Sequence, residues 1–188
     1  MKKRISMLLV IVLCLCMCAC GSKEDTQEDV QENTDKSSSS SSTQDSMPLF
    51  STVDIEGNTV TSDIFSQVDL TVVNFWATYC NPCIGEMPEL AEWSESMPDN
   101  VQIVGIVVDV ASEDSSEYQT AKQIVEKTGV NFQHLLPTAE MKEVMSKLIG
   151  VPTTIFVDKE GRIVGRPIVG ADVGGYKKFV EEYLNEQE

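Results

Sequence analysis

The sequence predicts an α/β fold with a mixed central sheet flanked by helices, and three observations support this prediction. Short apolar runs rich in β-branched residues alternate with longer segments of helical periodicity between residues 48 and 188. A four-residue turn, Asp158–Gly161, separates the last two runs, so these strands form a hairpin and the sheet is not wholly parallel. The length of 188 residues allows one domain of ordinary size plus appendages.

The first half of this region predicts a hairpin, a buried strand and a helix. Ser51–Val60 has Glu56-Gly57 at its centre, which is typical of a short hairpin. Thr71–Trp76 (TVVNFW) is apolar enough for a buried strand. A helix is expected to begin around Cys80–Cys83 and to end near Met97.

The second half continues the alternation of strands and helices. The expected segments are a strand at Val101–Val108, a helix that ends at Gly129, a short strand at Phe132–Leu136, a helix at Glu140–Ile149, a strand at Thr153–Val157, a returning strand at Arg162–Val169, and a closing helix with Val173, Tyr176, Val180 and Leu184 on its apolar face.

Residues 1–19 predict an export signal rather than part of the domain. Residues 1–4 are positively charged, and the apolar run from Ile5 to Ala19 is about fifteen residues, shorter than the roughly 20 that a spanning helix needs. Residues 17–21 (MCACG) resemble a bacterial lipobox, with Met17 where leucine is commoner. This resemblance implies a lipoprotein signal peptide and a lipid on Cys20. Ordinary secretion with cleavage elsewhere is the alternative.

Residues 20–47 are expected to form a disordered tether behind the lipidated Cys20. The segment is rich in acids and contains six consecutive serines at Ser37–Ser42, so it has too little apolar surface to offset the entropy of ordering. About 27 residues of such chain have a reach of roughly 25–30 Å. The formal net charge of −16 disfavours binding to nucleic acid and to anionic headgroups.

Two cysteines remain as thiols after such processing, Cys80 and Cys83. A disulfide that closes only four residues stabilises a fold by roughly 2 kcal/mol, which makes a purely structural role unattractive. Structural zinc needs four ligands, usually from two such pairs, and no second pair follows. Copper held by the two thiols and the single histidine, His134, stays open because three ligands can suffice for a soft ion.

The position of the pair favours redox chemistry. It follows an apolar strand and opens a helix, so unpaired N–H groups and the positive end of the helix dipole face the first sulfur. That environment lowers a thiol pKa and populates the nucleophilic thiolate. We expect Cys80 to be the exposed nucleophile and Cys83, one turn later, to resolve the mixed disulfide. Pro82 suits the first helical turn, where its missing N–H is not needed.

Residues 76–83 (WATYCNPC) resemble the active site of the thioredoxin superfamily, specifically its TlpA/ResA-like extracytoplasmic branch. The similarity extends over residues 48–188. Pro88 matches a helix-kinking proline, residues 150–153 (GVPT) match a loop with a cis proline, and residues 155–161 (IFVDKEG) resemble the closing hairpin. The resemblance implies a thioredoxin-like sheet with an N-terminal hairpin and an αβ insertion at about residues 117–136.

The resemblance also implies the residues of the site. A substrate would be contacted by Trp76, Tyr79, Pro82, Val151 and Pro152, although Trp76 and Trp93 are also expected to be packing residues. No cofactor beyond the Cys80–Cys83 disulfide is implied, and no metal.

Glu86 matches an acidic residue of the same branch, and Asn74 occupies the position of thioredoxin's buried aspartate. The i to i+3 spacing places Glu86 beside Cys83, where we expect it to take the proton from Cys83 or to return it. The alternative is a first-turn glutamate that is merely favoured by the helix dipole. A carboxylate close to thiols raises their pKa values, which favours a reductant over an oxidant.

The resulting expectation is a monomeric, membrane lipoprotein that reduces disulfides in exported proteins on the extracytoplasmic side, with antioxidant activity. The resemblance implies apocytochrome c or a methionine sulfoxide reductase as substrate and a CcdA/DsbD-like membrane electron donor. Two alternatives remain: a disulfide-forming oxidase of the same fold, and a non-enzymatic copper-binding lipoprotein.

Overall fold

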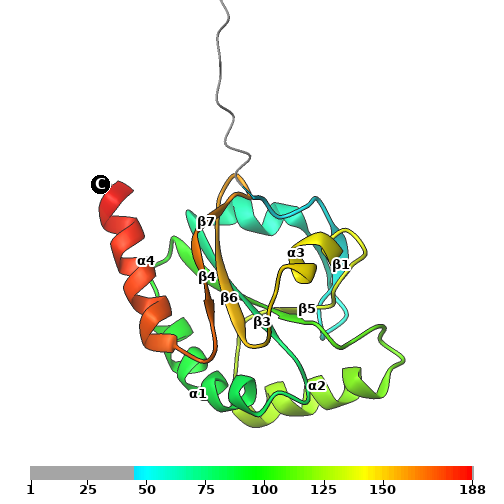
Figure 1. Ribbon diagram of the computed structural model, residues 1–188. Helices are drawn as coiled ribbons and strands as arrows, with labels where there is room; N and C mark the ends of the chain where they lie inside the picture. Colours follow the sequence, from blue (N-terminus) through cyan, green and yellow to red (C-terminus); the bar gives the residue numbers. More distant parts are fainter. Residues whose placement is uncertain (1–44, 188) are drawn as a thin grey trace, which may run out of the picture. The chain divides into compact units, whose positions relative to one another are not determined.

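The computed structural model describes residues 45–187, which form a five-stranded sheet covered by helices (Figure 1). The strand order is β5-β4-β3-β6-β7, and a separate two-stranded sheet pairs β1 with β2. The elements in chain order are β1 (Ser51–Val53), β2 (Thr59–Thr61), the 3₁₀ helix η1 (Ser62–Gln67), β3 (Leu70–Trp76), α1 (Asn81–Glu95), β4 (Val101–Val107), α2 (Ser116–Thr128), β5 (His134–Leu135), α3 (Lys142–Ser146), β6 (Thr153–Asp158), β7 (Ile163–Val169) and α4 (Val173–Gln187).

The expected mixed sheet is confirmed. β3 pairs in parallel with β4 and antiparallel with β6, and β6 pairs antiparallel with β7. The N-terminal hairpin is also present, with Ser51 opposite Thr61. The predicted end of the second helix is confirmed too, because Gly129 follows α2 with a φ of 73°, a left-handed conformation that glycine adopts without a steric penalty.

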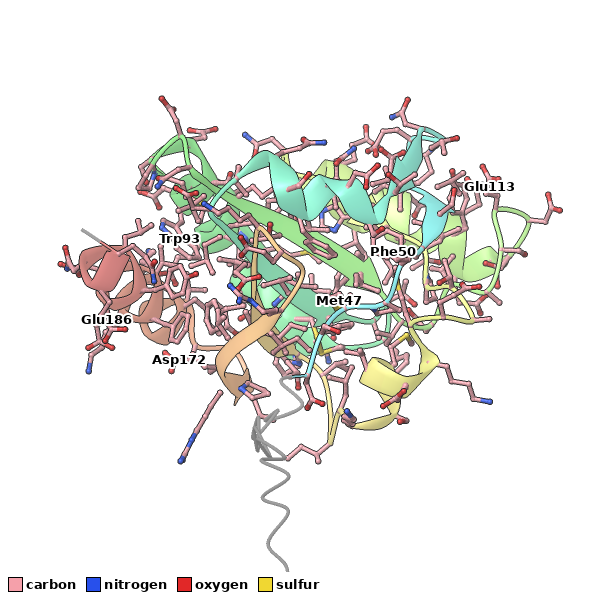
Figure 2. The ribbon with its side chains drawn as sticks, turned by 90° about the horizontal axis from the view of Figure 1, so that it is seen from above. Met47, Phe50, Trp93, Glu113, Asp172 and Glu186 are labelled. Atoms are coloured by element: carbon pink, nitrogen blue, oxygen red, sulfur yellow. A yellow bond between two sulfur atoms is a disulfide. The ribbon has the colours of Figure 1, made fainter. Side chains whose placement is uncertain are left out.

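The alternating residues of β3 separate the two faces of the sheet. Val73 and Phe75 belong to a core with Met47, Phe50 and residues of η1 and α3, whereas Leu70 and Val72 pack in a second core with α1 and α4. Figure 2 shows Trp93, which belongs to the second core, beside α4 and away from Phe50. Asn74 therefore lies on the face that α1 covers, because side chains two residues apart share a face.

The described residues 45–47 precede the predicted domain boundary at residue 48 and are part of the fold. Met47 is buried, its N–H donates to the Gly161 carbonyl oxygen at 2.9 Å, and the Ile163 N–H donates to the Asp45 carbonyl oxygen at 2.8 Å. Residues 45–47, which were assigned to the disordered tether, therefore pair with the β6–β7 turn. The signal peptide, Cys20 and the rest of the tether lie outside the described residues.

Three segments differ from their expected lengths. β5 covers only His134–Leu135 because the neighbouring N–H of Leu136 donates to Val53 of the hairpin rather than to β4. α3 is limited to Lys142–Ser146. η1 was not expected, because six residues are too few to show a helical period, although it buries Ile64 and Phe65. Within residues 45–187, no helix has the length and apolarity needed to cross a membrane.

Candidate active site

Cys80 and Cys83 lie at the N-terminus of α1 and form a disulfide with an S–S distance of 2.07 Å. Cys80 is the N-cap residue, and its Sγ accepts the Cys83 backbone N–H at 3.2 Å. Cys80 is only 6% exposed and Cys83 only 1%. The expected exposed nucleophile is thus largely covered, because Cys80 and Cys83 pack in one cluster with Trp76, Ala77 and Val151. Cys80 remains the more accessible of the two residues.

A loop with a cis proline lies against the disulfide. The Val151–Pro152 peptide bond is cis, as the resemblance implied. The Val151 carbonyl oxygen lies 3.5 Å from Cys80 Sγ, so a reduced Cys80 thiol can donate to it. Gly170, at the end of β7, donates its N–H to the Pro152 carbonyl oxygen at 2.8 Å. Gly170 therefore holds the loop at Pro152, and the Val151 carbonyl oxygen of the same loop faces the Cys80 sulfur.

The residues assigned to substrate contact differ in accessibility. Tyr79 is 73% exposed, Pro82 is exposed and Val151 is half-buried, so these three can contact a bound peptide. Pro152 is buried. Trp76 is fully buried, which corrects its assignment as a substrate contact. It is a packing residue because it ends β3 beneath the site, between the sheet and the helices.

His134 is the partner of Trp76 and not of the cysteines. The Trp76 Nε1–H donates to His134 Nδ1 at 3.1 Å, and His134 is 1% exposed. Burial lowers the pKa of His134 to about 3, so its imidazole is neutral at pH 7. Among residues 45–187, no three His, Cys, Asp or Glu side chains are grouped so that they could hold a metal ion. The copper site postulated from Cys80, Cys83 and His134 is therefore not assembled.

Glu86 is a buried carboxylate one turn after Cys83 on α1, and it is 5% exposed. Its Oε1 accepts from Asn74 Nδ2 at 2.9 Å, and its Oε2 lies 3.1 Å from the Tyr176 hydroxyl. Asn74 also donates to Thr154 Oγ1 at 3.0 Å, because the two residues are directly opposite in the β3–β6 register. The carboxylate is thus held by the sheet on one side and by α4 on the other.

The pKa of Glu86 is raised to about 6, chiefly because burial penalises its charged form. Hydrogen bonds from Asn74 and Tyr176 partly oppose this shift, whereas the negative charges of Glu89 and Asp172 add to it. Glu86 can therefore change its protonation state near neutral pH, which a general acid or base requires. A surface glutamate that is merely stabilised by the helix dipole would not be enclosed in this way.

Two residues of the site were missed from the sequence. Tyr176 was interpreted only as part of the apolar face of the closing helix. Asp109 follows β4, and its carboxylate accepts both the backbone N–H and the hydroxyl of Thr78, two residues before Cys80. One signal was available: the carboxyl ends of parallel strands meet at one edge of a sheet, and Asp109 follows β4 where Thr78 follows β3.

The fold and this site together define a thiol-disulfide oxidoreductase of the thioredoxin class. Comparison with known proteins supplies the family: residues 43–166 match the AhpC/TSA family, and the chain belongs to it. The thiol-disulfide oxidoreductase ResA of Bacillus anthracis is 28% identical over 145 residues, which cover 73% of each chain.

Solved structures agree with this assignment. A thiol:disulfide interchange protein from Bacteroides sp. is 26% identical, with a TM-score of 0.58 over 73% of this chain and 90% of that one. StoA from Bacillus subtilis is 20% identical, with a TM-score of 0.54 over 67% of this chain and 90% of that one, and supports the fold alone.

Proposed function

We propose that this chain reduces disulfide bonds in exported proteins on the extracytoplasmic side of the cell membrane, to which a lipid on Cys20 anchors it. The observation that carries the reducing direction is the buried carboxylate of Glu86 behind the Cys80–Cys83 pair. Location and anchoring rest on the sequence of residues 1–20, and the chemistry rests on the site.

The direction follows from the charge that Glu86 carries. With a pKa of about 6, it is ionised in about nine molecules in ten at pH 7. Its negative charge, one helical turn from Cys83, disfavours a second negative charge on either sulfur. The reduced protein is destabilised when it holds a thiolate, and a dithiol whose reduced form is less stable is a stronger reductant.

The reaction proceeds in two exchanges. The Cys80 thiolate attacks one sulfur of a substrate disulfide, which forms a mixed disulfide and releases one substrate thiolate. Cys83 then transfers its proton to Glu86 and attacks the Cys80 sulfur, which forms the Cys80–Cys83 disulfide and releases the second substrate thiolate. The substrate gains two electrons and the protein loses two; the released thiolates take protons from solvent, and Glu86 returns its proton there.

The cycle needs a partner that supplies electrons but no bound cofactor. An oxidising compartment does not re-reduce the pair, so a membrane electron donor of the CcdA/DsbD kind is the proposed source. The proposed substrates are apocytochrome c or a methionine sulfoxide reductase, approached by the monomeric domain through Tyr79, Pro82 and Val151.

An oxidase of the same fold is the second candidate, and one contact favours it. The Cys83 N–H that points at Cys80 Sγ stabilises a thiolate there, which favours the reduced form. The helix terminus and Glu86 thus act in opposite directions on the same sulfur, and the midpoint potential reports their sum.

The deciding experiment is a redox titration of Ser41–Glu188, the compact unit that contains the site. Its thiols are equilibrated with dithiothreitol and glutathione mixtures, and alkylation is followed by mass. A midpoint near or below about −270 mV supports the reductant, whereas one near about −120 mV makes the protein an oxidase. In cells, Cys20→Ser should release the full chain from the membrane fraction, and its retention there would contradict the lipid anchor.

A further inference from the structure

The hydroxyl of Tyr176 lies between two groups that both need its single hydrogen. The Tyr176 side chain is fully buried. Its Oη lies 2.8 Å from the Gly170 carbonyl oxygen and 3.1 Å from Glu86 Oε2, and the Asp172 N–H donates to it at 3.3 Å. A phenol carries one hydrogen and accepts through its oxygen. It can therefore direct one full hydrogen bond at Gly170 or at Glu86, but not at both.

The protonation state of Glu86 decides between these two arrangements. When Glu86 is ionised, its oxygen can only accept, so Tyr176 donates to it and leaves the Gly170 carbonyl oxygen without that hydrogen. When Glu86 is protonated, its own O–H donates to Tyr176 Oη, and the tyrosine hydrogen turns to Gly170. One proton on Glu86 thus changes the bonding of a backbone group on another element.

That backbone group is attached to the cis-proline loop. The same glycine, Gly170, donates its N–H to the Pro152 carbonyl oxygen at 2.8 Å. The preceding Val151 carbonyl oxygen lies 3.5 Å from Cys80 Sγ. A continuous series of contacts therefore connects the turn of α1 after Cys83 to the sulfur of Cys80. It runs through Glu86, Tyr176, Gly170 and the Val151–Pro152 loop.

We propose that Tyr176 is a positioning residue that couples the proton on Glu86 to the Val151–Pro152 loop through Gly170. The inference deepens the proposed function, since it rests on Glu86 as the acceptor of the Cys83 proton. When that proton arrives during resolution of the mixed disulfide, Tyr176 releases Glu86 and bonds Gly170. The loop that faces Cys80 is then held differently before and after Cys83 has given up its proton.

The charged groups that act on Glu86 come from α1 and from the residues before α4. Glu89 on α1 and Asp172 before α4 raise its pKa, and Lys177 on α4 is paired with Glu89 at 2.9 Å. Asn74 and Thr154 from the sheet are neutral and do not titrate in the relevant range. The other titratable groups of the site are the carboxylate of Asp109, which accepts from Thr78, the phenol of Tyr176, whose pKa is raised to about 12, and the two cysteines once the disulfide is reduced.

The first test follows the wild-type, reduced, full-length chain by ¹³C NMR as a function of pH. The Gly170 carbonyl signal should move with the same midpoint as the Glu86 carboxyl signal, because the Tyr176 hydroxyl hydrogen changes its acceptor from Glu86 to Gly170 when Glu86 is protonated. A Gly170 signal that stays constant while Glu86 titrates would overturn the coupling. This measurement needs no variant.

The second test is Tyr176→Phe, with Tyr118→Phe as the matched control. Tyr118 is also buried, but its hydroxyl donates to the Ile55 carbonyl oxygen at 2.9 Å, away from Glu86. Loss of a hydrogen bond to a carboxylate should raise the Glu86 midpoint by about one pH unit in Tyr176→Phe, and by nothing in the control. An equal shift in both variants, or none in either, would contradict the assignment.

The kinetic readout is the resolution of a Cys80–glutathione mixed disulfide, followed by the mass of the peptide that contains both cysteines. Tyr176→Phe should slow resolution about fivefold at pH 6, where fewer Glu86 side chains are ionised, and should match wild type above about pH 8. If Glu86→Gln slows resolution but Tyr176→Phe does not, the coupling fails and the proposed function stands. If Tyr176→Phe shifts the Glu86 midpoint while Glu86→Gln leaves resolution unchanged, the hydrogen-bond coupling stands and the proton-acceptor role of Glu86 fails.

Discussion

Replacing Glu86 by glutamine removes the buried charge while keeping a side chain of the same size that can still accept from Asn74. Residues i and i+3 on a helix have Cβ atoms about 5–6 Å apart. A unit charge at about 6 Å with an effective dielectric constant of about 20 acts with about 3 kcal/mol, or about 2 pKa units, before salt screening. We therefore expect Glu86→Gln to lower the pKa of the Cys83 thiol by one to two units, and to raise the midpoint potential by about 30–60 mV through that thiolate.

The assay is the pH dependence of alkylation of Cys83 and of Cys80 by iodoacetamide, read for each cysteine on the reduced protein by fragment mass. Glu89→Gln is the matched control, because Glu89 lies one turn further along α1, is exposed and pairs with Lys177. In the control, the pH midpoint of alkylation should stay within about 0.3 pH units of wild type, as expected for a solvent-screened charge. Identical profiles for wild type and Glu86→Gln would refute both the charge argument and the reducing direction drawn from it.

Three further predictions concern stability, each measured by urea unfolding. Burial lowers the pKa of His134 from 6.5 to about 3, so between these pH values the unfolded state binds more protons than the folded state. The free energy of unfolding should therefore fall by up to about 5 kcal/mol as the pH falls from 6.5 to 3. His134→Leu should flatten this pH dependence, and an unchanged dependence would contradict the assignment. Gly105→Ala should cost about 1–3 kcal/mol, since its Cβ would lie 2.3 Å from His134 Nδ1, and a neutral effect would show that the imidazole can move. Asp109→Ala should cost about 1.5–3 kcal/mol because the Thr78 N–H and hydroxyl lose a charged acceptor, and a loss below about 0.5 kcal/mol would refute that role.

The central sheet was predictable because its strands are short, apolar and bounded by turn residues. The β6–β7 turn illustrates this: Asp158 accepts the N–H groups of Glu160 and Arg162, and Gly161 has a φ of 80°. The N-terminal boundary was not predictable, because residues 45–47 contain one apolar side chain, and their ordering depends on backbone pairing with a strand more than a hundred residues later. Amino-acid composition indicates the entropic cost of ordering a segment, but it does not identify the distant residues whose hydrogen bonds offset that cost.

The sulfur chemistry of the site could be predicted because it depends on local spacing at the start of a helix. The buried setting of Glu86 depends on register and could not. Asn74 and Thr154 meet because β3 and β6 are aligned residue for residue, and Tyr176 reaches Glu86 from a helix 90 residues later. Helical periodicity assigned Tyr176 to the core correctly, but periodicity describes where a side chain lies and says nothing of what its hydroxyl bonds.

The pairing of residues 45–47 with the β6–β7 turn places the first described residues and the disulfide at opposite ends of the central sheet. This turn lies beside Leu70, where β3 begins, whereas Cys80 follows the end of β3, about 23 Å further along a seven-residue strand (Figure 1). Under the anchoring proposed above, the chain would enter the domain at the end of the sheet opposite the disulfide, so the point of attachment would not hold the disulfide against the lipid surface. The proposed membrane donor would then meet the disulfide only in orientations that bring the far end of the sheet to the lipid surface. Under the same proposal, shortening the chain before Asp45 should slow re-reduction of the Cys80–Cys83 disulfide by the membrane donor before it slows the reduction of substrate disulfides.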